Sequence, residues 1–435
     1  MPLNPIPKIE QESKSGIKLF QEKLLRENLK YINANSKFYK DLFKKNSISI
    51  EKIKTLEDLA SVPVTTKEDL QKRSKDFICV PKTKIIDYIT TSGTMGEPVT
   101  FVLTENDLER LAYNEYLSFL CADGSPNDIY QLMTTIDRRF MAGLAYFLGV
   151  RKLGAGIVRV GNGIPELQWD TIERISPTKI IVVPSFIPKI IEYAEQNNIN
   201  YRSSSVKSAV CIGDPLRNVD FTLNLLGQKI KEKWNIELYS TYASTEMATA
   251  FTECKEGKGG HHHPELIIVE FLDENDNPVH RDEPGEITIT TLGVEGMPLL
   301  RFKTGDICYR HEEPCSCGRN TLRLGPIIGR KKQMIKFKGT TLYPPAFYDI
   351  LNNVDGINNY VIEVYTNSIG TDEMIVYIDA KDTGLKFEKI IKDNFRAKLR
   401  VTPSIIFKDK NEIINLQNAE TSRKPRHFID NRQNS

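Results

Sequence analysis

The amino-acid sequence predicts an α/β protein: a large N-terminal domain of mixed sheets with flanking helices, followed by a small α+β domain. Between residues 105 and 241, strand-like and helical patterns alternate, an order that builds mostly parallel sheets with helices on their faces. From Leu266 onward, paired alternating runs indicate an antiparallel, barrel-like subregion. After Arg330, a basic stretch with glycine and proline leads into a compact βαββα pattern.

Length and composition fit a globular enzyme. The 435 residues leave room for two or three domains, and 40% hydrophobic with 27% charged residues is an ordinary globular balance. A formal net charge of +2 gives no electrostatic reason to expect nucleic acid or a membrane surface as partner. No apolar run has signal-peptide form or approaches the ~20 residues of a spanning helix. We therefore expect a cytoplasmic enzyme.

The N-terminal region carries helical signals. Residues 17–45 have apolar side chains at helical spacing, which predicts two amphipathic helices packed on the main domain. Two starts that resemble capping boxes follow, Thr55 with Asp58 and Thr66 with Asp69, around a proline break. These signals concern structure and carry no chemistry.

The middle of the chain alternates helix and strand. The expected elements are, in order, a helix capped by Thr104 over Glu105–Cys121, strand Ile129–Thr135, helix Met141–Leu153, strand Gly156–Val160, helix Pro165–Ile175, strand Lys179–Val183, helix Ile187–Asn197, strand Ser208–Ile212, helix Asp220–Trp234 and strand Ile236–Thr241. In such folds ligands bind at the carboxyl ends of strands, and the polar motifs fall there.

The last part of the chain first shows strand patterns and then the pattern of a small α+β domain. Residues 266–279 predict a hairpin around Asn275–Asn277, and residues 285–292 an alternating strand. The small domain should contain helix Phe347–Asn353, strand Asn359–Thr366, strand Glu373–Asp379 and helix Phe387–Lys398. Residues 418–435 are polar and typical of a mobile tail.

The segment Tyr88–Thr104 contains a loop rich in glycine and hydroxyl groups, with Ser92, Gly93 and Thr94 at its centre. Glycine lets the backbone approach an anion, and hydroxyls with successive N–H groups can surround phosphate oxygens. The Walker pattern GxxxxGK[ST] is absent. Two interpretations stay open at this point, a phosphate cradle and a simple hairpin turn.

Three further polar motifs follow, YASTE at 242–246, TGD at 304–306 and GRKKQMIKFKG at 329–339. Each has a structural interpretation of its own. Glu246 suits a helix start, where the helix dipole favours a carboxylate, TGD is a turn tripeptide, and Gly339 could close a hairpin.

Together and in this order, these motifs resemble the phosphate-loop, acyl-pocket and magnesium, ribose and hinge motifs of adenylate-forming enzymes, which include acyl-CoA synthetases, adenylation domains and luciferases. The segment Gly213-Asp214-Pro215 is similar to their adenine-lining element. The resemblance is closest to the phenylacetate–CoA ligase family, through Pro184-Ser185-Phe186, residues 254–274 and the CSCGR stretch at 315–319. It extends from about residue 20 to residue 430.

The resemblance implies ATP-dependent activation of a carboxylic acid, of aryl or arylalkyl type, to an acyl-adenylate, followed by transfer of the acyl group to coenzyme A. ATP, Mg²⁺ and coenzyme A would be the cofactors. The implied nucleotide-binding residues are Ser92, Gly93 and Thr94 at the phosphates, Gly213, Asp214, Pro215, Tyr242, Ala243, Ser244 and Thr245 around the adenine and acyl-phosphate region, and Asp306 and Arg330 at the ribose. Glu246 would hold Mg²⁺, and the acid pocket would include Phe140, Ser185, Phe186 and Ala243.

The resemblance also gives the C-terminal domain a role. Lys424 matches the family's terminal lysine, which neutralises charge as the carboxylate attacks phosphorus. Lys332 stands at the hinge position, so the expected domains are 1–331, with the ATP, acid and zinc sites, and 332–435, a mobile domain carrying the catalytic lysine. The competing interpretation of Lys424 is a solvated basic tail.

Seven cysteines without an evident secretion signal do not indicate a disulfide framework. Cys254, His261, Cys315 and Cys317 would supply three thiolates and one imidazole, a standard tetrahedral donor set for zinc. The family pattern favours His261 over His262 or His263. With all four positions filled by protein, the zinc would be structural; reduced surface cysteines beside a polar histidine run are the alternative.

Three positions depart from the family pattern. Met95 and Glu97 stand where Thr and Lys are common, which should weaken attraction for the triphosphate, and Ala243 replaces a glycine and should narrow the pocket. Two other functions stay open: an adenylating enzyme that passes the acyl group to a carrier protein or an amine, and a zinc-stabilised binding protein without catalysis. A homodimer is also left open.

Overall fold

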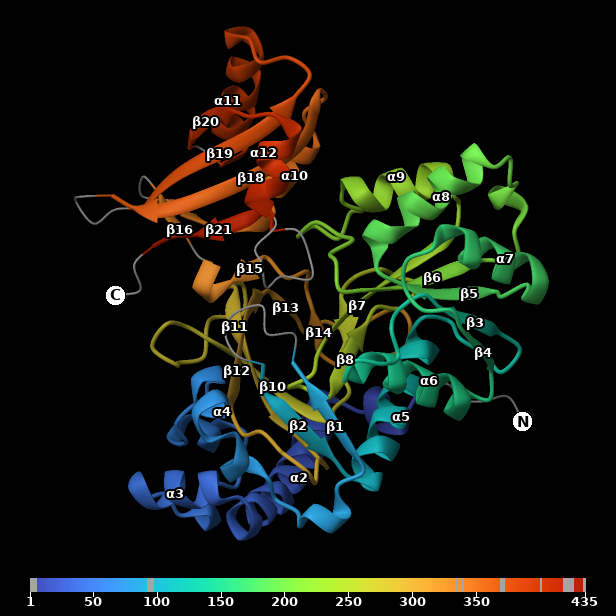
Figure 1. Ribbon diagram of the computed structural model, residues 1–435. Coiled ribbons are helices and arrows are strands. Elements are labelled where there is room, and N and C mark those ends of the chain that lie inside the picture. Colours follow the sequence, from blue (N-terminus) through green and yellow to red (C-terminus); the bar gives the residue numbers. More distant parts are fainter. Residues whose placement is uncertain are drawn as a thin grey trace. The chain divides into compact units, whose positions relative to one another are not determined.

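The computed structural model describes residues 6–91, 98–333, 335–337, 340–367, 372–399, 401–417 and 426–432 (Figure 1). The chain divides into two compact units, one of Met1–Thr304 with Cys308–Ile327 and the other of Gly305–Ile307 with Ile328–Ser435. Among the described residues, no helix is both long enough and apolar enough to cross a bilayer.

The first unit begins with helices α1 (Lys8–Gln11), α2 (Lys14–Asn35) and α3 (Lys37–Lys45), so the prediction of two helices over residues 17–45 is confirmed. The side chains of Ser13 and Ser36 cap α2 and α3, and the apolar faces of both helices pack into the main core. Helix α4 (Lys67–Arg73) starts with the expected capping box of Thr66 and Asp69. The equivalent pair Thr55 and Asp58 precedes only a short 3₁₀ turn.

A six-stranded sheet forms the centre of the first unit, in the order β4-β3-β5-β6-β7-β8. The first five strands are parallel and β8 is antiparallel, which confirms the expected α/β class. The strands are β3 (Ile129–Leu132), β4 (Gly156–Arg159), β5 (Lys179–Val182), β6 (Ser208–Ile212), β7 (Glu237–Ser244) and β8 (Thr249–Thr252).

Helices cover both faces of this sheet (Figure 1). Ile181 and Val210 point to the layer with α5 (Glu105–Cys121) and α6 (Met141–Leu153), while Ile180 and Val182 point to the layer with α7 (Pro165–Ile175), α8 (Ile187–Gln196) and α9 (Leu225–Lys233). Helix α9 begins later than predicted because Asn218 and Thr222 form a hydrogen-bonded turn first and Asn224 caps the helix.

The antiparallel region is built from open sheets, and the described residues contain no closed barrel. Strands β1 (Asp87–Thr90) and β2 (Thr100–Leu103) pair as expected on the two sides of the glycine-rich loop. A four-stranded sheet has the order β10-β11-β12-β15, and a three-stranded sheet the order β13-β14-β9. Their strands are β9 (Gly260–His261), β10 (Ile267–Leu272), β11 (Gly285–Thr291), β12 (Phe302–Cys308), β13 (Arg310–His311), β14 (Arg323–Leu324) and β15 (Gly329–Arg330).

The predicted hairpin at residues 266–279 is shorter than expected. The chain does turn at Asp273–Asn277, but only a single bridge joins Leu272 to Pro278. Strand β10 instead pairs along its whole length with β11, because both strands present alternate apolar side chains to the same core.

The second unit has a four-stranded sheet in the order β20-β19-β18-β21. Its elements are β16 (Ile335–Phe337), β17 (Thr340–Leu342), α10 (Pro344–Asn352), β18 (Ile357–Thr366), β19 (Asp372–Ala380), α11 (Leu385–Leu399), β20 (Ser404–Phe407), α12 (Lys410–Gln417) and β21 (Phe428–Asp430). The prediction of a mobile tail over residues 418–435 is wrong for β21, which pairs with β18 because Phe428 and Ile429 can be half-buried there.

Candidate functional site

The predicted pocket and adenine residues follow four neighbouring strands of the six-stranded sheet. Phe140 follows β3, Pro184–Phe186 follows β5, Gly213–Pro215 follows β6, and residues 242–246 end β7 and enter the next turn. These strands are adjacent and parallel, so their carboxyl ends lie on one edge (Figure 1). The structure therefore brings the four segments together where ligands bind in open α/β sheets.

Two of these segments are in direct contact. The backbone N–H of Ser185 donates to Asp214 Oδ2 at 3.3 Å. Gly213, the residue before Asp214, has a φ of +78° and turns the chain sharply after β6. Glycine adopts this conformation without strain. Ser185 is exposed, and Phe186 and Asp214 are half-buried, so all three can meet a ligand at this edge.

Glu246 lies in the turn between β7 and β8 and is half-buried. The Ser244 hydroxyl accepts the Met247 N–H at 3.3 Å, and Ala248 closes the turn with a φ of +47°. Tyr242 packs against Phe251, with ring centroids 6.2 Å apart, and Ala243 is exposed. A cavity of about 10 Å³, room for about one water, lies behind the turn and touches Glu246.

The TGD motif and the start of the hinge motif meet across two strands. Asp306 on β12 is opposite Arg330 on β15, and Arg330 Nε donates to Asp306 Oδ1 at 3.0 Å. The Asp306 side chain is 11% exposed and that of Arg330 47%. Each oxygen of a carboxylate has two lone pairs, which makes it the kind of acceptor that the vicinal hydroxyls of a sugar require.

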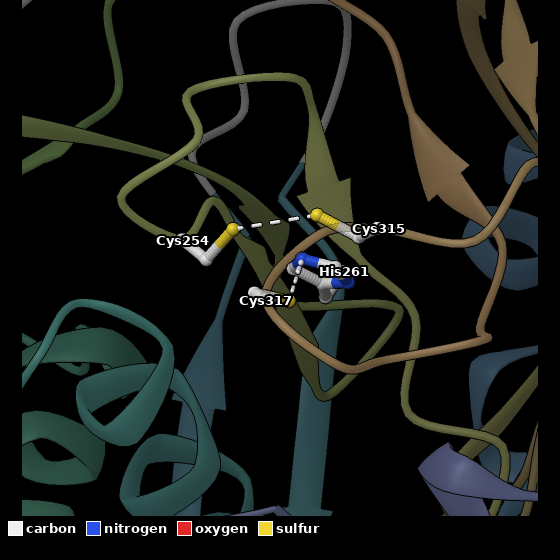
Figure 2. A group of neighbouring side chains, drawn as sticks. All are labelled: Cys254, His261, Cys315 and Cys317. Carbon is white, nitrogen blue, oxygen red and sulfur yellow. Dashed lines mark hydrogen bonds between the residues drawn. The ribbon is translucent and has the colours of Figure 1, made fainter.

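The four predicted zinc ligands form a compact group (Figure 2). Their ligand atoms all lie within 4.8 Å of one another, with Cys254 Sγ 3.7 Å from Cys315 Sγ and Cys317 Sγ 3.5 Å from His261 Nε2. Ligands at 2.0–2.3 Å around a tetrahedral zinc ion are separated by about 3.5–3.8 Å. The donor set and its spacing thus fit zinc.

The neighbouring histidines, His262 and His263, make contacts outside this group. His262 Nε2 lies 2.5 Å from the carbonyl oxygen of Ile267, and His263 Nδ1 lies 2.6 Å from Glu10 Oε1. Hydrogen bonding from the Cys254 thiol, and then from His261, lowers the pKa of Cys317 far below that of a free thiol. The group therefore favours a thiolate, the form of cysteine that binds metal.

Comparison with known proteins identifies the family. Residues 27–296 match the family described as AMP-binding enzyme. The chain belongs to the AMP-binding enzyme family. This confirms the resemblance to adenylate-forming enzymes that the ordered motifs indicate.

The AMP-binding enzyme has curated relatives that are phenylacetate–coenzyme A ligases. The protein of Thermus thermophilus is 27% identical over 350 residues, covering 79% of this chain and 77% of the relative. The protein of Escherichia coli K12 is 26% identical over 389 residues, covering 87% and 85%. Among solved structures, 2-hydroxyisobutyryl-CoA ligase in the postadenylation state has a TM-score of 0.85 at 21% identity, covering 99% of this chain and 94% of the other. The whole fold is thus that of a CoA ligase.

Some predicted residues of this AMP-binding enzyme lie outside the part of the chain that the structure describes. They are Ser92, Gly93, Thr94, Met95, Glu97 and Lys424. Lys332 belongs to a short 3₁₀ turn, Lys331–Gln333, but its side chain is likewise outside the description. Their roles remain predictions from the sequence.

Sequence reasoning missed a buried arginine under the Glu246 turn. Arg110 on α5 donates to the carbonyl oxygens of Ala248 at 2.5 Å, Leu266 at 2.6 Å and Leu292 at 2.7 Å, and to Thr249 Oγ1 at 3.1 Å. Burial lowers the pKa of Arg110 to about 10. An arginine in an amphipathic helix is normally expected on the solvent-exposed face, so nothing in the sequence indicates that Arg110 is buried.

Arg138 and Arg139 were also missed. Both have positive φ, +60° and +59°, a conformation that is strained for residues other than glycine. The carbonyl oxygen of Arg139 accepts the Thr90 N–H at 3.0 Å, which places this exposed basic pair beside the strand that enters the glycine-rich loop. Two adjacent arginines directly before the predicted pocket residue Phe140 could have indicated a basic pair near the site.

Proposed function

We propose that this AMP-binding enzyme converts a carboxylic acid of aryl or arylalkyl type to its coenzyme A thioester through an acyl-adenylate. One observation carries the proposal. The segments that resemble the nucleotide and acid motifs of phenylacetate–CoA ligases follow consecutive strands at one edge of the parallel sheet, in a chain whose curated relatives include those ligases.

In the first half-reaction, a carboxylate oxygen of the acid forms a bond to the α-phosphorus of ATP, and the bond to pyrophosphate breaks. Asp306 accepts hydrogen bonds from the ribose hydroxyls with Arg330 supporting it, and Asp214 and Tyr242 border the adenine. Glu246 would hold Mg²⁺, whose charge helps to neutralise the phosphates. Lys424 stabilises the negative charge that develops at the α-phosphoryl oxygens.

In the second half-reaction, the coenzyme A sulfur forms a bond to the acyl carbonyl carbon, and the bond from that carbon to AMP breaks. The thiol proton leaves to solvent as the thiolate forms. The C-terminal domain, residues 332–435, is proposed to move about Lys332 between the two steps. ATP and coenzyme A as substrates support a cytoplasmic location.

Aromatic side chains support an aryl or arylalkyl acid. Phe140 is 37% exposed and Phe186 is half-buried, and both follow neighbouring strands at the proposed site. Ala243, with its exposed methyl group, would narrow the pocket relative to glycine. An aromatic ring gains apolar contact with these side chains without requiring a buried charge.

Pyrophosphate release tests the first step. It should require ATP, Mg²⁺ and a carboxylic acid, and a panel of aromatic and aliphatic acids identifies the preferred one. Thioester formation with free coenzyme A separates this function from adenylation followed by transfer to a carrier protein or amine. No release with any acid of the panel would favour a zinc-stabilised binding protein.

We propose that Cys254, His261, Cys315 and Cys317 hold a structural zinc ion. All four positions are filled by protein, so the ion would tie the loop around Cys254–His261 to the loop of Cys315 and Cys317. Purified protein should contain about one zinc atom per chain by metal analysis. Cys317→Ser should lose it and Cys211→Ser, a buried cysteine inside strand β6, should keep it.

A further inference from the structure

A buried acid–base network lies directly behind the cysteine and histidine group. Arg319, two residues after Cys317, donates from Nη1 to Cys317 Sγ at 3.6 Å and from Nε to Glu10 Oε2 at 2.8 Å. The other oxygen of Glu10 contacts His263. Glu10 and His263 are 0% exposed and Arg319 is 4% exposed, so water does not screen this network.

The network joins distant parts of the chain. The N–H of Asn320 donates to the carbonyl oxygen of Glu10 at 2.7 Å, and its side-chain amide donates to the carbonyl oxygens of Gln11 and Glu12 at 2.8 and 3.2 Å. Helix α1 is thus fastened to the loop of Cys315 and Cys317 through both backbone and side chains. Glu10 and Arg319 are 309 residues apart in sequence.

The net charge of the zinc group explains why an arginine lies beside it. Three thiolates, a neutral imidazole and a divalent zinc ion have a net charge of −1, which is costly in a buried site unless it is compensated. Arg319 supplies one positive charge and an N–H donor at a sulfur. Glu10 contributes orientation: its carboxylate contacts both the Arg319 guanidinium and His263, and so fixes the direction in which the guanidinium faces the sulfur.

We propose that Glu10 and Arg319 are positioning residues of the metal site, through which the N-terminal helix α1 controls how firmly zinc is held. This inference rests on the proposed zinc site. Arg319 partly neutralises the Cys317 thiolate, and Glu10 fixes the guanidinium and, through His263, the strand that carries His261. Thr321 Oγ1, 3.5 Å from His261 Nδ1, holds the other side of that imidazole.

The test measures zinc release from the full-length protein into excess chromogenic chelator, well below the unfolding temperature. Glu10→Gln should release zinc at least about tenfold faster than wild type, the usual scale for groups that orient metal ligands. Glu270→Gln is the matched control, because it neutralises a comparable carboxylate that pairs with buried Arg301 at 2.9 Å. It should release zinc at the wild-type rate.

Arg319→Lys provides a second variant that keeps the charge but lacks the planar fork that reaches both partners. It should release zinc at a rate between those of wild type and Glu10→Gln. In cobalt-substituted protein, both variants should shift the thiolate-to-cobalt absorption band to lower energy, because a sulfur that loses an N–H donor gives up electrons more readily. A purely structural role would not move this band.

Wild-type release rates and an unmoved band in both variants would overturn the proposal, as would equally fast release from Glu270→Gln. A wild-type protein that neither contains nor takes up zinc overturns the metal site and this proposal with it. An active or inactive ligase is a separate result, because none of these measurements depends on turnover.

Discussion

Arg330 and Asp306 face each other across β15 and β12, and the guanidinium Nε donates to the carboxylate at 3.0 Å. Asp306→Asn keeps the shape of the side chain but removes its charge. Charge-assisted hydrogen bonds contribute about 1.5–3 kcal/mol, so the KM for ATP should rise roughly 10- to 100-fold. Steady-state pyrophosphate assays measure it. Asp372→Asn, which breaks an ion pair with Arg432 in the same unit, should leave this KM unchanged; equal effects would contradict the ribose role.

Glu246→Gln should impair the magnesium-dependent step. A neutral amide binds Mg²⁺ more weakly than a carboxylate, and the ion contributes several kcal/mol of charge stabilisation, so kcat/KM for pyrophosphate release should fall roughly 100-fold. Titration with Mg²⁺ should recover part of the loss. Glu237→Gln removes an exposed carboxylate from β7, the strand that leads into the Glu246 turn, and serves as the control. An unchanged Mg²⁺ requirement in Glu246→Gln would count against the assignment.

Lys424→Ala should separate the two half-reactions. Adenylation should fall at least about 100-fold, because a cation at the reacting phosphoryl group is lost. ATP binding, measured by calorimetry, should remain largely intact, and thioester formation from synthetic acyl-adenylate should stay near the wild-type rate. Arg423→Ala removes the neighbouring positive charge and should retain adenylation. Normal turnover of Lys424→Ala would show that this lysine is a solvated surface residue.

The basic pair beside β1 should help to attract the nucleotide. Replacing both Arg138 and Arg139 with Gln should raise the KM for ATP about tenfold at low ionic strength, and the difference should shrink in high salt. The effect matters more here because Glu97 replaces the lysine common in the phosphate loop. Arg202→Gln, at an exposed arginine stacked on Tyr201, controls for the loss of a single surface charge away from the site. A salt-independent change would point to distortion of the strained backbone instead.

Glu115 should make the stability of the protein depend on pH. Burial raises its pKa from 4.5 to about 8. Between pH 5 and 8 the folded chain therefore holds a proton that the unfolded chain has lost, and stability falls as pH rises through this window. Wild type should lose roughly 3 kcal/mol more than Glu115→Gln between these pH values in denaturant unfolding. Glu109→Gln, exposed on the same helix, should behave like wild type; parallel curves for all three proteins would refute the shift.

Local signals explain which elements could be predicted. Helix α7 is bounded by Pro165 and a left-handed Ser176, and α6 ends at Gly154, so their limits follow from neighbouring residues. Strand β21 was missed because three residues gain strand structure only by pairing with β18. The sequence pattern indicated antiparallel strands but could not decide whether they close into a barrel.

The residues of the candidate site also fall into those that the sequence could predict and those that it could not. Three cysteines and a histidine could be grouped by donor type and by resemblance, and in the structure it is His261 that lies with the three cysteines, while His262 and His263 contact Ile267 and Glu10. Arg110 and Glu10 could not be found from the sequence. Arg110 donates to the carbonyl oxygen of Ala248, and Glu10 accepts from Arg319. Both partners are far away in the sequence, so the contacts that stabilise these buried charges can be seen only in the folded chain.

The backbone N–H of Arg426 donates to the carbonyl oxygen of Gln417 at 3.1 Å, and His427 and β21 continue along β18. Lys424 is two residues from Arg426, so its Cα cannot lie more than about 7 Å away from that anchor. In sequence, Lys424 thus comes just before the segment that pairs with β18. We therefore expect substitutions that disrupt the pairing of β21 with β18 to weaken adenylation, although they leave the proposed catalytic lysine itself unchanged.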